Sequence, residues 1–525
     1  MILVFLMNWG FRLKTYQQGL AIAMLVPLLM ATSVRAAEPE NKCKLLEVEN
    51  LPLTFTGAAF SPTIPGSING NPTKVLIDLS SYETSVETAA LDAMGIGYRD
   101  TFRKVKGIGG NTVAYEVRLD ELKAGPAKGK GRFRAYEYAT ADYGFRVGAD
   151  FLLRTDLEIA LAQKYIKFWS PVDCGQKHLA FWDEDAVVIP FTVHADDDPR
   201  PLFKVKINGQ EAEAMFSPST AMSIIDSNLA RKIGLAPDSP KLTDAGKTRG
   251  IDGSPMKSWM AKIDQLEVGG EMIKNVKIRM LDTGPSVQVI LGADFMRAHR
   301  ILISSKQKLI YLTYTGGEVF PKEAGVNEAW FRAELAAGNP DAQVHMGNAE
   351  GDKPAAERDE AKQLAWYQKA AEQGNRSGQI KVGRYKFAKG DFAGGAGDFK
   401  LAQARKNSAT LSAQLYLASA RSGKTAQALE DLKATKLKSS DDWAKNAIDF
   451  LLGKIDAREL RMKPAIGTWT QNSVACGAEF YIGQSHIIAG QTALARPALE
   501  AAVAVCKDDT FESAAARMDL DRLPK

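Results

Sequence analysis

The chain has 525 residues, of which 45% are hydrophobic and 25% charged, and its formal net charge is +5. This length predicts two to four domains, and the composition is that of a globular protein rather than a disordered or fibrous chain. Three of the positive charges (Arg12, Lys14 and Arg35) lie in the first 36 residues, which carry no acid, so the remainder is only +2 and offers no argument for nucleic-acid binding.

The first 36 residues predict a secretory signal. Arg12 and Lys14 precede an apolar stretch at residues 20–30, and Val34 and Ala36 place small residues at the −3 and −1 positions of a cleavage site. An uncleaved anchor is the alternative, although the stretch is shorter than the roughly 20 residues of a spanning helix. We therefore expect a periplasmic or otherwise exported protein, with no membrane span after cleavage.

Residues 44–175 predict a small, mainly β domain. It is organised around an apolar strand, residues 75–77, that ends on Asp78 and is followed by small polar residues. The other expected elements are a strand at 51–55, a turn at 67–70, a helix with a capping box of Thr84 and Glu87 that ends at Gly95, a glycine-rich hairpin tip at 107–110, a strand at 112–119, a basic glycine-rich loop at 123–134 and an apolar stretch at 147–152.

The same features return in order in residues 186–316, which indicates an internal duplication. The matches are Asn208 with Asn69, Ser217 with Asp78, Ser223 with Thr84, Asp226 with Glu87 and Gly234 with Gly95 at an offset of 139, then 250–253 with 107–110 at 143 and 292–295 with 148–151 at 144. The offset between matching residues changes by only five, from 139 to 144, so the sequence predicts a second domain of the same fold. Within it, residues 194–201 are expected to form a surface loop, and a calcium site there is the weaker interpretation.

Residues 325–525 predict a helical solenoid. Residues 361–374 carry apolar side chains at helical spacing, and Ala337-Gly338-Asn339 is repeated 36 residues later as Gln373-Gly374-Asn375. A period in the thirties with paired helices is typical of repeat proteins. Residues 409–423 and 480–505 are expected to be later turns of the same array.

The four cysteines allow three disulfide pairings in an exported protein. Cys43 and Cys174 bracket the first β unit, and Cys476 and Cys506 lie together near the end of the chain, so we expect these two pairs. Metal binding is the weaker interpretation, because the sequence has no CxxC or HExxH spacing and its five histidines are scattered. No metal or other cofactor is predicted.

Both β units resemble retropepsin-like aspartyl proteases over residues 50–316. The resemblance rests on the strand that ends at Asp78, on the GIGG and GIDG hairpins, and on VGADFL and VILGADFM. The helical part resembles Sel1 and tetratricopeptide repeats, most specifically in LAWYQKAAEQG at residues 364–374. The resemblance implies two mainly-β retropepsin-like domains that form a pseudo-dimer, followed by an α-helical solenoid that binds a partner protein.

The sequence departs from the family's Asp-Thr/Ser-Gly motif in both units. The first has Asp78-Leu79-Ser80 and the second Ser217-Pro218-Ser219, so one carboxylate of the implied catalytic pair is missing. Peptide hydrolysis by this family uses two carboxylates that flank one water molecule and share one proton. A serine cannot take up a proton from that water near neutral pH. Loss of one general acid–base group typically lowers the reaction rate by roughly 10²–10⁴-fold. Leu79 also removes the hydroxyl that would brace the two active loops.

The two glycine-rich hairpins are the candidate substrate-binding flaps. Their residues are Gly107, Ile108, Gly109 and Gly110 in the first unit and Gly250, Ile251, Asp252 and Gly253 in the second. A plain tight turn is the alternative for each. The basic run at 123–134 is interpreted as a solvated loop, with a patch for an anionic partner as the alternative.

Three functions are compatible with these residues. The first is a peptide-binding module with weak or no proteolysis, whose solenoid recruits a second protein. The second is an active aspartic-type endopeptidase assembled as a homodimer through two Asp78 side chains. The third is an assembly protein whose β units only pack. The sequence predicts no nucleic-acid partner.

Overall fold

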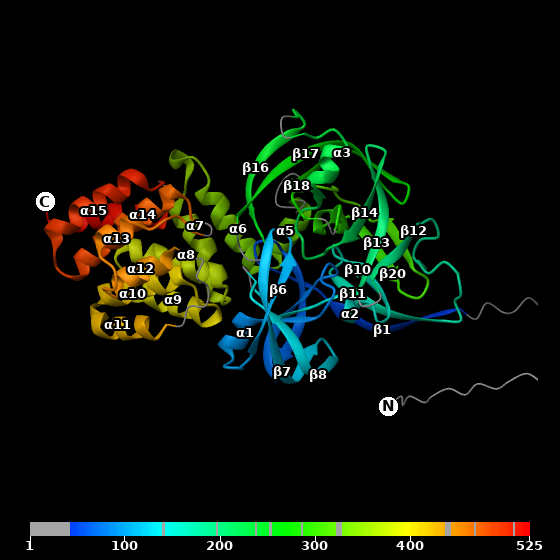
Figure 1. The fold of residues 1–525 in the computed structure, drawn as a ribbon, viewed down its shortest axis with the longest axis horizontal. Coiled ribbons are helices and arrows are strands. Elements are labelled where there is room, and N and C mark those ends of the chain that lie inside the picture. Colours follow the sequence, from blue (N-terminus) through cyan, green and yellow to red (C-terminus); the bar gives the residue numbers. More distant parts are fainter. Residues whose placement is uncertain are drawn as a thin grey trace, which may run out of the picture. The chain divides into compact units, whose positions relative to one another are not determined.

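The structure is a computed structural model, and residues 43–525 form one compact unit in it (Figure 1). The residues that it describes are 43–138, 142–195, 198–236, 239–250, 255–284, 287–321, 328–435, 443–466, 469–507 and 510–524. The predicted signal, residues 1–36, lies outside them. Among the described residues, no helix has both the length and the apolar character needed to cross a membrane.

The first β unit is an eight-stranded sheet in the order β2-β3-β4-β9-β5-β8-β7-β6, which folds back on itself because β3 also pairs with β7. Its elements are β2 (Thr54–Thr56), β3 (Ser61–Ile68), β4 (Asn71–Ile77), β5 (Ser85–Glu87), α1 (Thr88–Ala93), β6 (Arg99–Gly107), β7 (Gly110–Ala124), β8 (Ala127–Tyr136), β9 (Phe145–Val147) and α2 (Ala149–Leu152).

The second β unit repeats this order strand for strand, as β12-β13-β14-β19-β15-β18-β17-β16 with β13 also pairing β17. Its elements are β12 (Val187–Ala195), β13 (Asp198–Ile207), β14 (Gln210–Phe216), β15 (Ile224–Asp226), α3 (Ser227–Lys232), β16 (Leu242–Arg249), β17 (Pro255–Val268), β18 (Glu271–Leu281), β19 (Val289–Leu291) and α4 (Ala293–Met296). The predicted duplication is confirmed.

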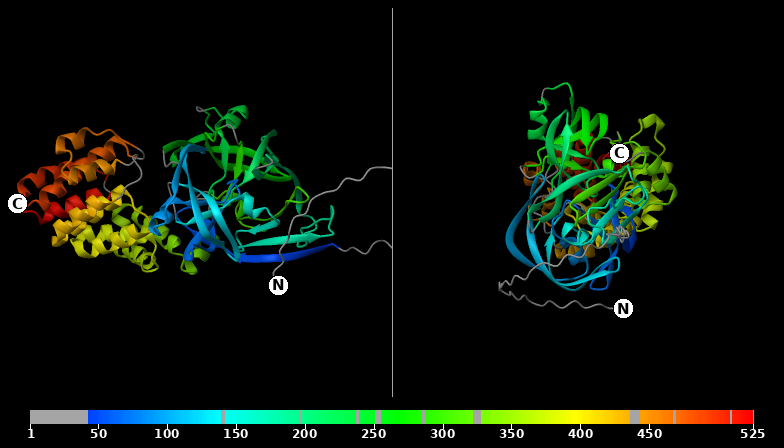
Figure 2. Two further views of the ribbon diagram at one scale, coloured as in Figure 1. Left: turned by 60° about the horizontal axis from the view of Figure 1, so that its bottom comes forward. Right: turned by 90° about the vertical axis from the view of Figure 1, so that its right-hand side faces the viewer.

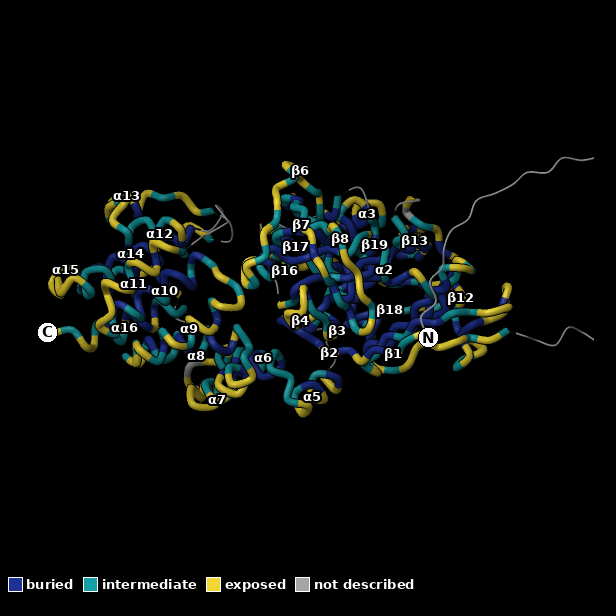
Figure 3. The backbone as a smooth tube through the Cα atoms, turned by 90° about the horizontal axis from the view of Figure 1, so that it is seen from below, coloured by how far each residue is buried: buried dark blue, intermediate teal, exposed yellow. Residues whose placement is uncertain are grey.

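A third set of strands joins the two units. The strands β1 (Lys44–Pro52), β11 (Tyr165–Val172), β10 (Asp156–Ala160), β20 (His299–Ser304) and β21 (Leu309–Tyr314) run in the order β1-β11-β10-β20-β21 and continue into β12. At the junction β10 pairs antiparallel with β20, with Leu157 opposite Ile303 and Ile159 opposite Ile301. These apolar side chains are buried, as expected for strands covered on both faces. The two units therefore share one core as a pseudo-dimer (Figure 3).

The helical region begins at α5 and contains two successive helix pairs with the predicted spacing (Figure 2). Gly338 and Gly374 end the first helix of each pair at φ +77° and +72°, and Asn339 and Asn375 cap the next helix through their side chains. The helices are α5 (Glu328–Ala336), α6 (Pro340–Gly351), α7 (Glu360–Glu372), α8 (Arg376–Lys389), α9 (Phe392–Arg405), α10 (Ala409–Ser419), α11 (Thr425–Ala434), α12 (Ala444–Leu451), α13 (Ala457–Met462), α14 (Gln471–Ile488), α15 (Thr492–Val505) and α16 (Phe511–Arg522).

Both expected disulfides are present. Cys43 is bonded to Cys174 with an S–S distance of 2.15 Å, and Cys476 to Cys506 with 2.11 Å. The first lies at the open end of the β1–β11 pair, where Lys44 is opposite Val172. It therefore ties the start of the first unit to its last strand.

Two predictions of loops are wrong. Residues 123–134 are not a loop: they form the end of β7 and most of β8, joined by a tight turn at Gly125 with φ +56°. The β-branched content of this segment is low, but the neighbouring strands supply its pairing. The segment 194–201 belongs to the β12–β13 hairpin, apart from residues 196 and 197, which lie outside the described residues.

The capping boxes are also misplaced. Glu87 and Asp226, expected in the first turn of a helix, are instead the residues that precede α1 and α3. The hydroxyls of Thr84 and Ser223 donate to Asp150 and Asp294 rather than to a helix N-terminus. A hydroxyl three residues before an acid is compatible with a capping box and also with a hydroxyl that donates to a distant carboxylate, so the sequence pattern did not distinguish the two.

Candidate functional site

The two loops that carry Asp78 and Ser217 are held in the same way. Each follows a strand, β4 or β14, that pairs in parallel with β9 or β19. The N–H of Asp78 donates to the carbonyl of Val147 at 3.1 Å, and that of Ser217 donates to Leu291 at 3.0 Å. Both side chains are buried.

The two loops face each other across the pseudo-dimer through Ser80. The Ser80 hydroxyl donates to Asp78 Oδ1 at 2.6 Å and accepts from the Ser217 hydroxyl at 3.1 Å. Leu79 makes no hydrogen bond between the loops, and the hydroxyl of the next residue, Ser80, supplies one instead. Leu79 is buried in the apolar core, and Ser80 makes the contact between loops.

The second loop surrounds Ser217 with other hydroxyls. Its Oγ lies 2.8 Å from the Thr220 hydroxyl and 3.3 Å from that of Ser219. Asp226, the acid nine residues after Ser217, caps α3 and accepts hydrogen bonds from Asn228 and Thr283, away from this loop. Among the hydrogen bonds of the described residues, Ser217 therefore has only hydroxyl and backbone partners.

Arg146 is the residue that sequence reasoning missed. Its Nη1 donates to Asp78 Oδ2 at 3.0 Å, its Nη2 donates to the Tyr143 hydroxyl at 2.9 Å, and its guanidinium lies 3.7 Å from the centre of the Tyr138 ring. A buried carboxylate and a largely buried cation are thus paired and hydrogen-bonded. The repeat contained the signal: at an offset of 144, Arg146 stands where the second unit has Ile290.

A second buried acid lies beside the same cation. Glu87 Oε1 is 3.7 Å from Arg146 Nη2, and the side chain is 1% exposed. Burial raises the pKa of Glu87 to about 8, against the opposing charges of Arg146 and Lys406. Near neutral pH Glu87 is therefore mostly uncharged, which leaves the charge of Arg146 to be balanced by Asp78.

Substitution of Glu87 by Gln is expected to change how stability depends on pH. The pKa of Glu87 is raised from 4.5 to about 8 in the folded protein, so between these values the folded chain holds a proton that the unfolded chain has lost. The free energy of unfolding therefore falls as the pH rises, by about 2–4 kcal/mol in the wild type relative to Glu87→Gln. Denaturant titrations at several pH values measure this, and a parallel pH dependence of both proteins would contradict it.

Hydroxyl–carboxylate pairs support both loops from behind. Thr84 donates to Asp150 at 2.8 Å, and its counterpart Ser223 donates to Asp294 at 2.6 Å. Asp294 also accepts from the backbone N–H groups of Ser223 and Phe295, and burial raises its pKa to about 6. The repeated VGADFL-type motif thus fixes the loops and does not provide a reacting group.

The tip of the first candidate flap meets Gly250, the described residue of the second. The tip residues Ile108 and Gly109 connect β6 to β7, with Gly109 at φ +73°. A Cβ on Gly250 would lie only 2.3 Å from the carbonyl oxygen of Gly109, so the backbones are in close contact there. Ile251, Asp252 and Gly253 lie outside the described residues.

The first flap reaches over the second unit. Ile108 packs against an apolar cluster of that unit, which is formed by Met215, Ile224, Leu281 and Ile290. This cluster includes the end of β14, directly before Ser217. The first hairpin is therefore more than a local turn, because its tip covers the second loop's side of the site.

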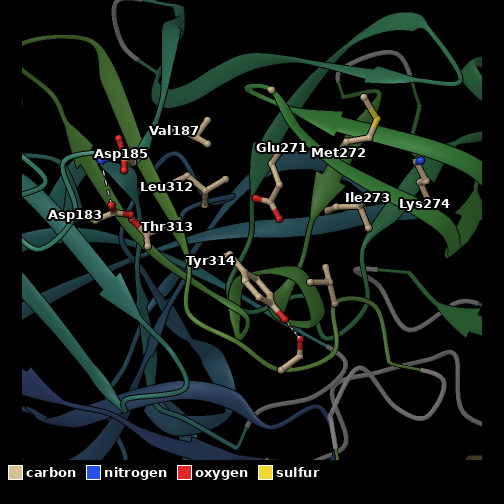
Figure 4. Close-up of a pocket in the computed structure, with 13 residues that line it drawn as sticks. Asp183, Asp185, Val187, Glu271, Met272, Ile273, Lys274, Leu312, Thr313 and Tyr314 are labelled. Atoms are coloured by element: carbon tan, nitrogen blue, oxygen red, sulfur yellow. Dashed lines mark hydrogen bonds between the residues drawn. The ribbon is translucent and has the colours of Figure 1, made fainter.

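A separate cavity of about 670 Å³ opens at the outer end of the second unit (Figure 4). Its lining includes Asp183, Val187, Glu271 and Tyr314, and none of the loop or flap residues above. This cavity does not coincide with the site at Asp78, so its volume does not bear on whether the protein binds or cleaves a peptide there. In the described part of the chain, no group of three or more His, Cys, Asp or Glu side chains is placed to hold a metal ion.

Comparison with known proteins finds one family model and solved structures to which the chain is similar. No curated protein matches the chain. Among solved structures, the chain is similar to the aspartic proteinase from Irpex lacteus, with 10% identity and a TM-score of 0.31 over 53% of this chain and 99% of that one. Two segments, residues 64–137 and 203–295, match the sequence model of the aspartyl protease family, and between them they contain Asp78, Ser217 and both candidate flaps.

Proposed function

We propose that the protein binds an extended peptide between its two β units with weak or no proteolysis. The observation that carries this proposal is the pairing of Asp78 with Arg146 at 3.0 Å, opposite a serine in place of a second acid. A carboxylate held by a cation and by Ser80 has few free positions for a water. Ser217 can orient a water but cannot accept its proton.

A homodimeric endopeptidase that uses two Asp78 side chains is the alternative. It needs a second Asp78 loop at the place where the Ser80 hydroxyl accepts from Ser217 of the same chain. The two β units would also have to separate along the β10–β20 pairing. These contacts favour the single-chain proposal, and the mass of the protein in solution is a direct check.

The helical region is proposed to be a Sel1- or tetratricopeptide-like solenoid that recruits a partner protein. Its support is the 36-residue recurrence of a glycine followed by a capping asparagine. We propose domains at 44–175, 186–316 and 325–525 after a signal at 1–36. The two disulfides support an exported location, because such bonds persist in oxidising compartments.

The test is to incubate the purified protein with an unfolded protein substrate at several acidic to neutral pH values, beside Asp78→Asn. We expect no difference in cleavage between the two proteins, together with retained peptide binding by the wild type. Cleavage that disappears in Asp78→Asn would overturn the proposal in favour of the endopeptidase. Absence of peptide binding in the wild type would also overturn it.

A further inference from the structure

The first flap carries an unusual surface feature, an exposed phenylalanine on a β-bulge. The pairing of β6 with β7 shifts register between Asp100 and Arg103, and Phe102 lies in this bulge at φ +58° with 91% of its surface exposed. Its N–H donates to Asp100 Oδ1 at 2.7 Å, and the Thr101 hydroxyl donates to the carbonyl of Ala114. These two hydrogen bonds, made by Phe102 itself and by the residue before it, thus fix the bulge.

The second unit has a bulge at the corresponding position, with glycine in place of Phe102. Its β16 shifts register between Asp244 and Lys247, and Gly246 has φ +71° with its N–H donating to Asp244 Oδ1 at 2.7 Å. Glycine adopts this backbone conformation without strain, whereas a bulky residue rarely does. The first unit therefore keeps a strained backbone and exposes an aromatic ring where folding alone favours glycine. Such local conflicts are expected at functional positions.

Phe102 lies in a strongly basic part of the first unit. From β6 to β8, residues 99–136 contain ten Lys and Arg against four Asp and Glu, whereas the corresponding residues 242–281 contain seven against five. Arg103 and Lys104 directly follow Phe102 and are exposed. Arg118 lies directly opposite Arg132 across β7 and β8, and Arg132 Nε is also 3.8 Å from Glu116 Oε1.

We propose that the surface formed by Phe102 and the adjacent exposed cations Arg103 and Lys104 docks the protein on an anionic phospholipid membrane. An exposed aromatic side chain can enter the interfacial layer of a bilayer while surrounding cations contact the lipid phosphates. A protein partner would need a larger contiguous apolar area than one side chain provides. A fluid anionic membrane needs no complementary shape, so it suits a single protruding ring among cations better than a folded protein partner does.

The test is co-sedimentation of the full chain with vesicles of phosphatidylcholine alone or mixed equally with phosphatidylglycerol. We expect binding to the anionic vesicles that is lost at high salt. Phe102→Gly, which copies Gly246, should lower the partition coefficient roughly ten-fold. Its melting temperature should not fall, because the substitution relieves strain. All variants keep residues 20–30, so differences between them report the surface around Phe102.

A matched pair of charge variants separates position from net charge. Arg103→Gln with Lys104→Gln removes two cations beside Phe102, and Lys262→Gln with Lys277→Gln removes two exposed cations from the second unit. The first variant should bind anionic vesicles roughly ten-fold more weakly, and the second should stay within about two-fold of the wild type. The proposal would be overturned if both charge variants lost binding equally or if Phe102→Gly bound as well as the wild type. It would also be overturned if the wild type showed no preference for anionic vesicles.

Discussion

Substitution of Ser217 by Asp together with Arg146 by Ile is expected to raise peptide hydrolysis by roughly 10²–10⁴-fold over the wild type. The first change supplies a second carboxylate opposite Asp78, within reach of the hydroxyls of Ser80 and Thr220 that now contact Ser217. The second releases Asp78 from its cation and introduces the residue found at Ile290 in the other unit. Two facing carboxylates can then divide the acid and base roles.

The surroundings of Arg146 are compatible with its removal. Burial raises the pKa of Glu87 to about 8, so this neighbouring carboxyl stays uncharged in an assay below about pH 7 and needs no cation. Each single substitution should remain near background, because one leaves Asp78 paired and the other leaves only one acid. Adding Asp78→Asn to the double variant should abolish the gain. A folded double variant with no gain would show that the lost acid is not what limits hydrolysis.

Removal of the Cys43–Cys174 disulfide is expected to lower the free energy of unfolding by roughly 5 kcal/mol. The bond closes a loop with a sequence separation of 131 residues, and the entropy that a cross-link removes from the unfolded chain grows with the loop. Denaturant unfolding of Cys43→Ala with Cys174→Ala, followed by tryptophan fluorescence, measures the change.

The second disulfide is the matched control. Cys476 and Cys506 are separated by only 30 residues, and their removal as Cys476→Ala with Cys506→Ala is expected to cost roughly 4 kcal/mol. Cys174, Cys476 and Cys506 are buried and Cys43 is half-buried, so the loss of packing should not be larger for the first pair. A larger loss from the shorter loop would contradict the loop-entropy explanation.

The sequence by itself determined the duplication, the positions of Asp78 and Ser217 at the ends of equivalent strands, and the repeated helix caps at Asn339 and Asn375, and it favoured the two disulfide pairs that the structure has. Each of these is recorded in local patterns or in a fixed offset between the repeats, and such patterns survive without knowledge of the fold. The offset also contained the contrast between Arg146 and Ile290, but not its consequence.

Only the tertiary structure decided what these residues contact. The pairing of Asp78 with Arg146, the bond between Ser80 and Ser217, and the burial that raises the pKa of Glu87 all depend on strands that are distant in sequence. The physical reason is that charge balance and hydrogen bonding in a buried site depend on distances of a few ångströms, which one-dimensional spacing does not specify. The same holds for Phe102, whose exposure and strain become apparent only when β6 is paired with β7.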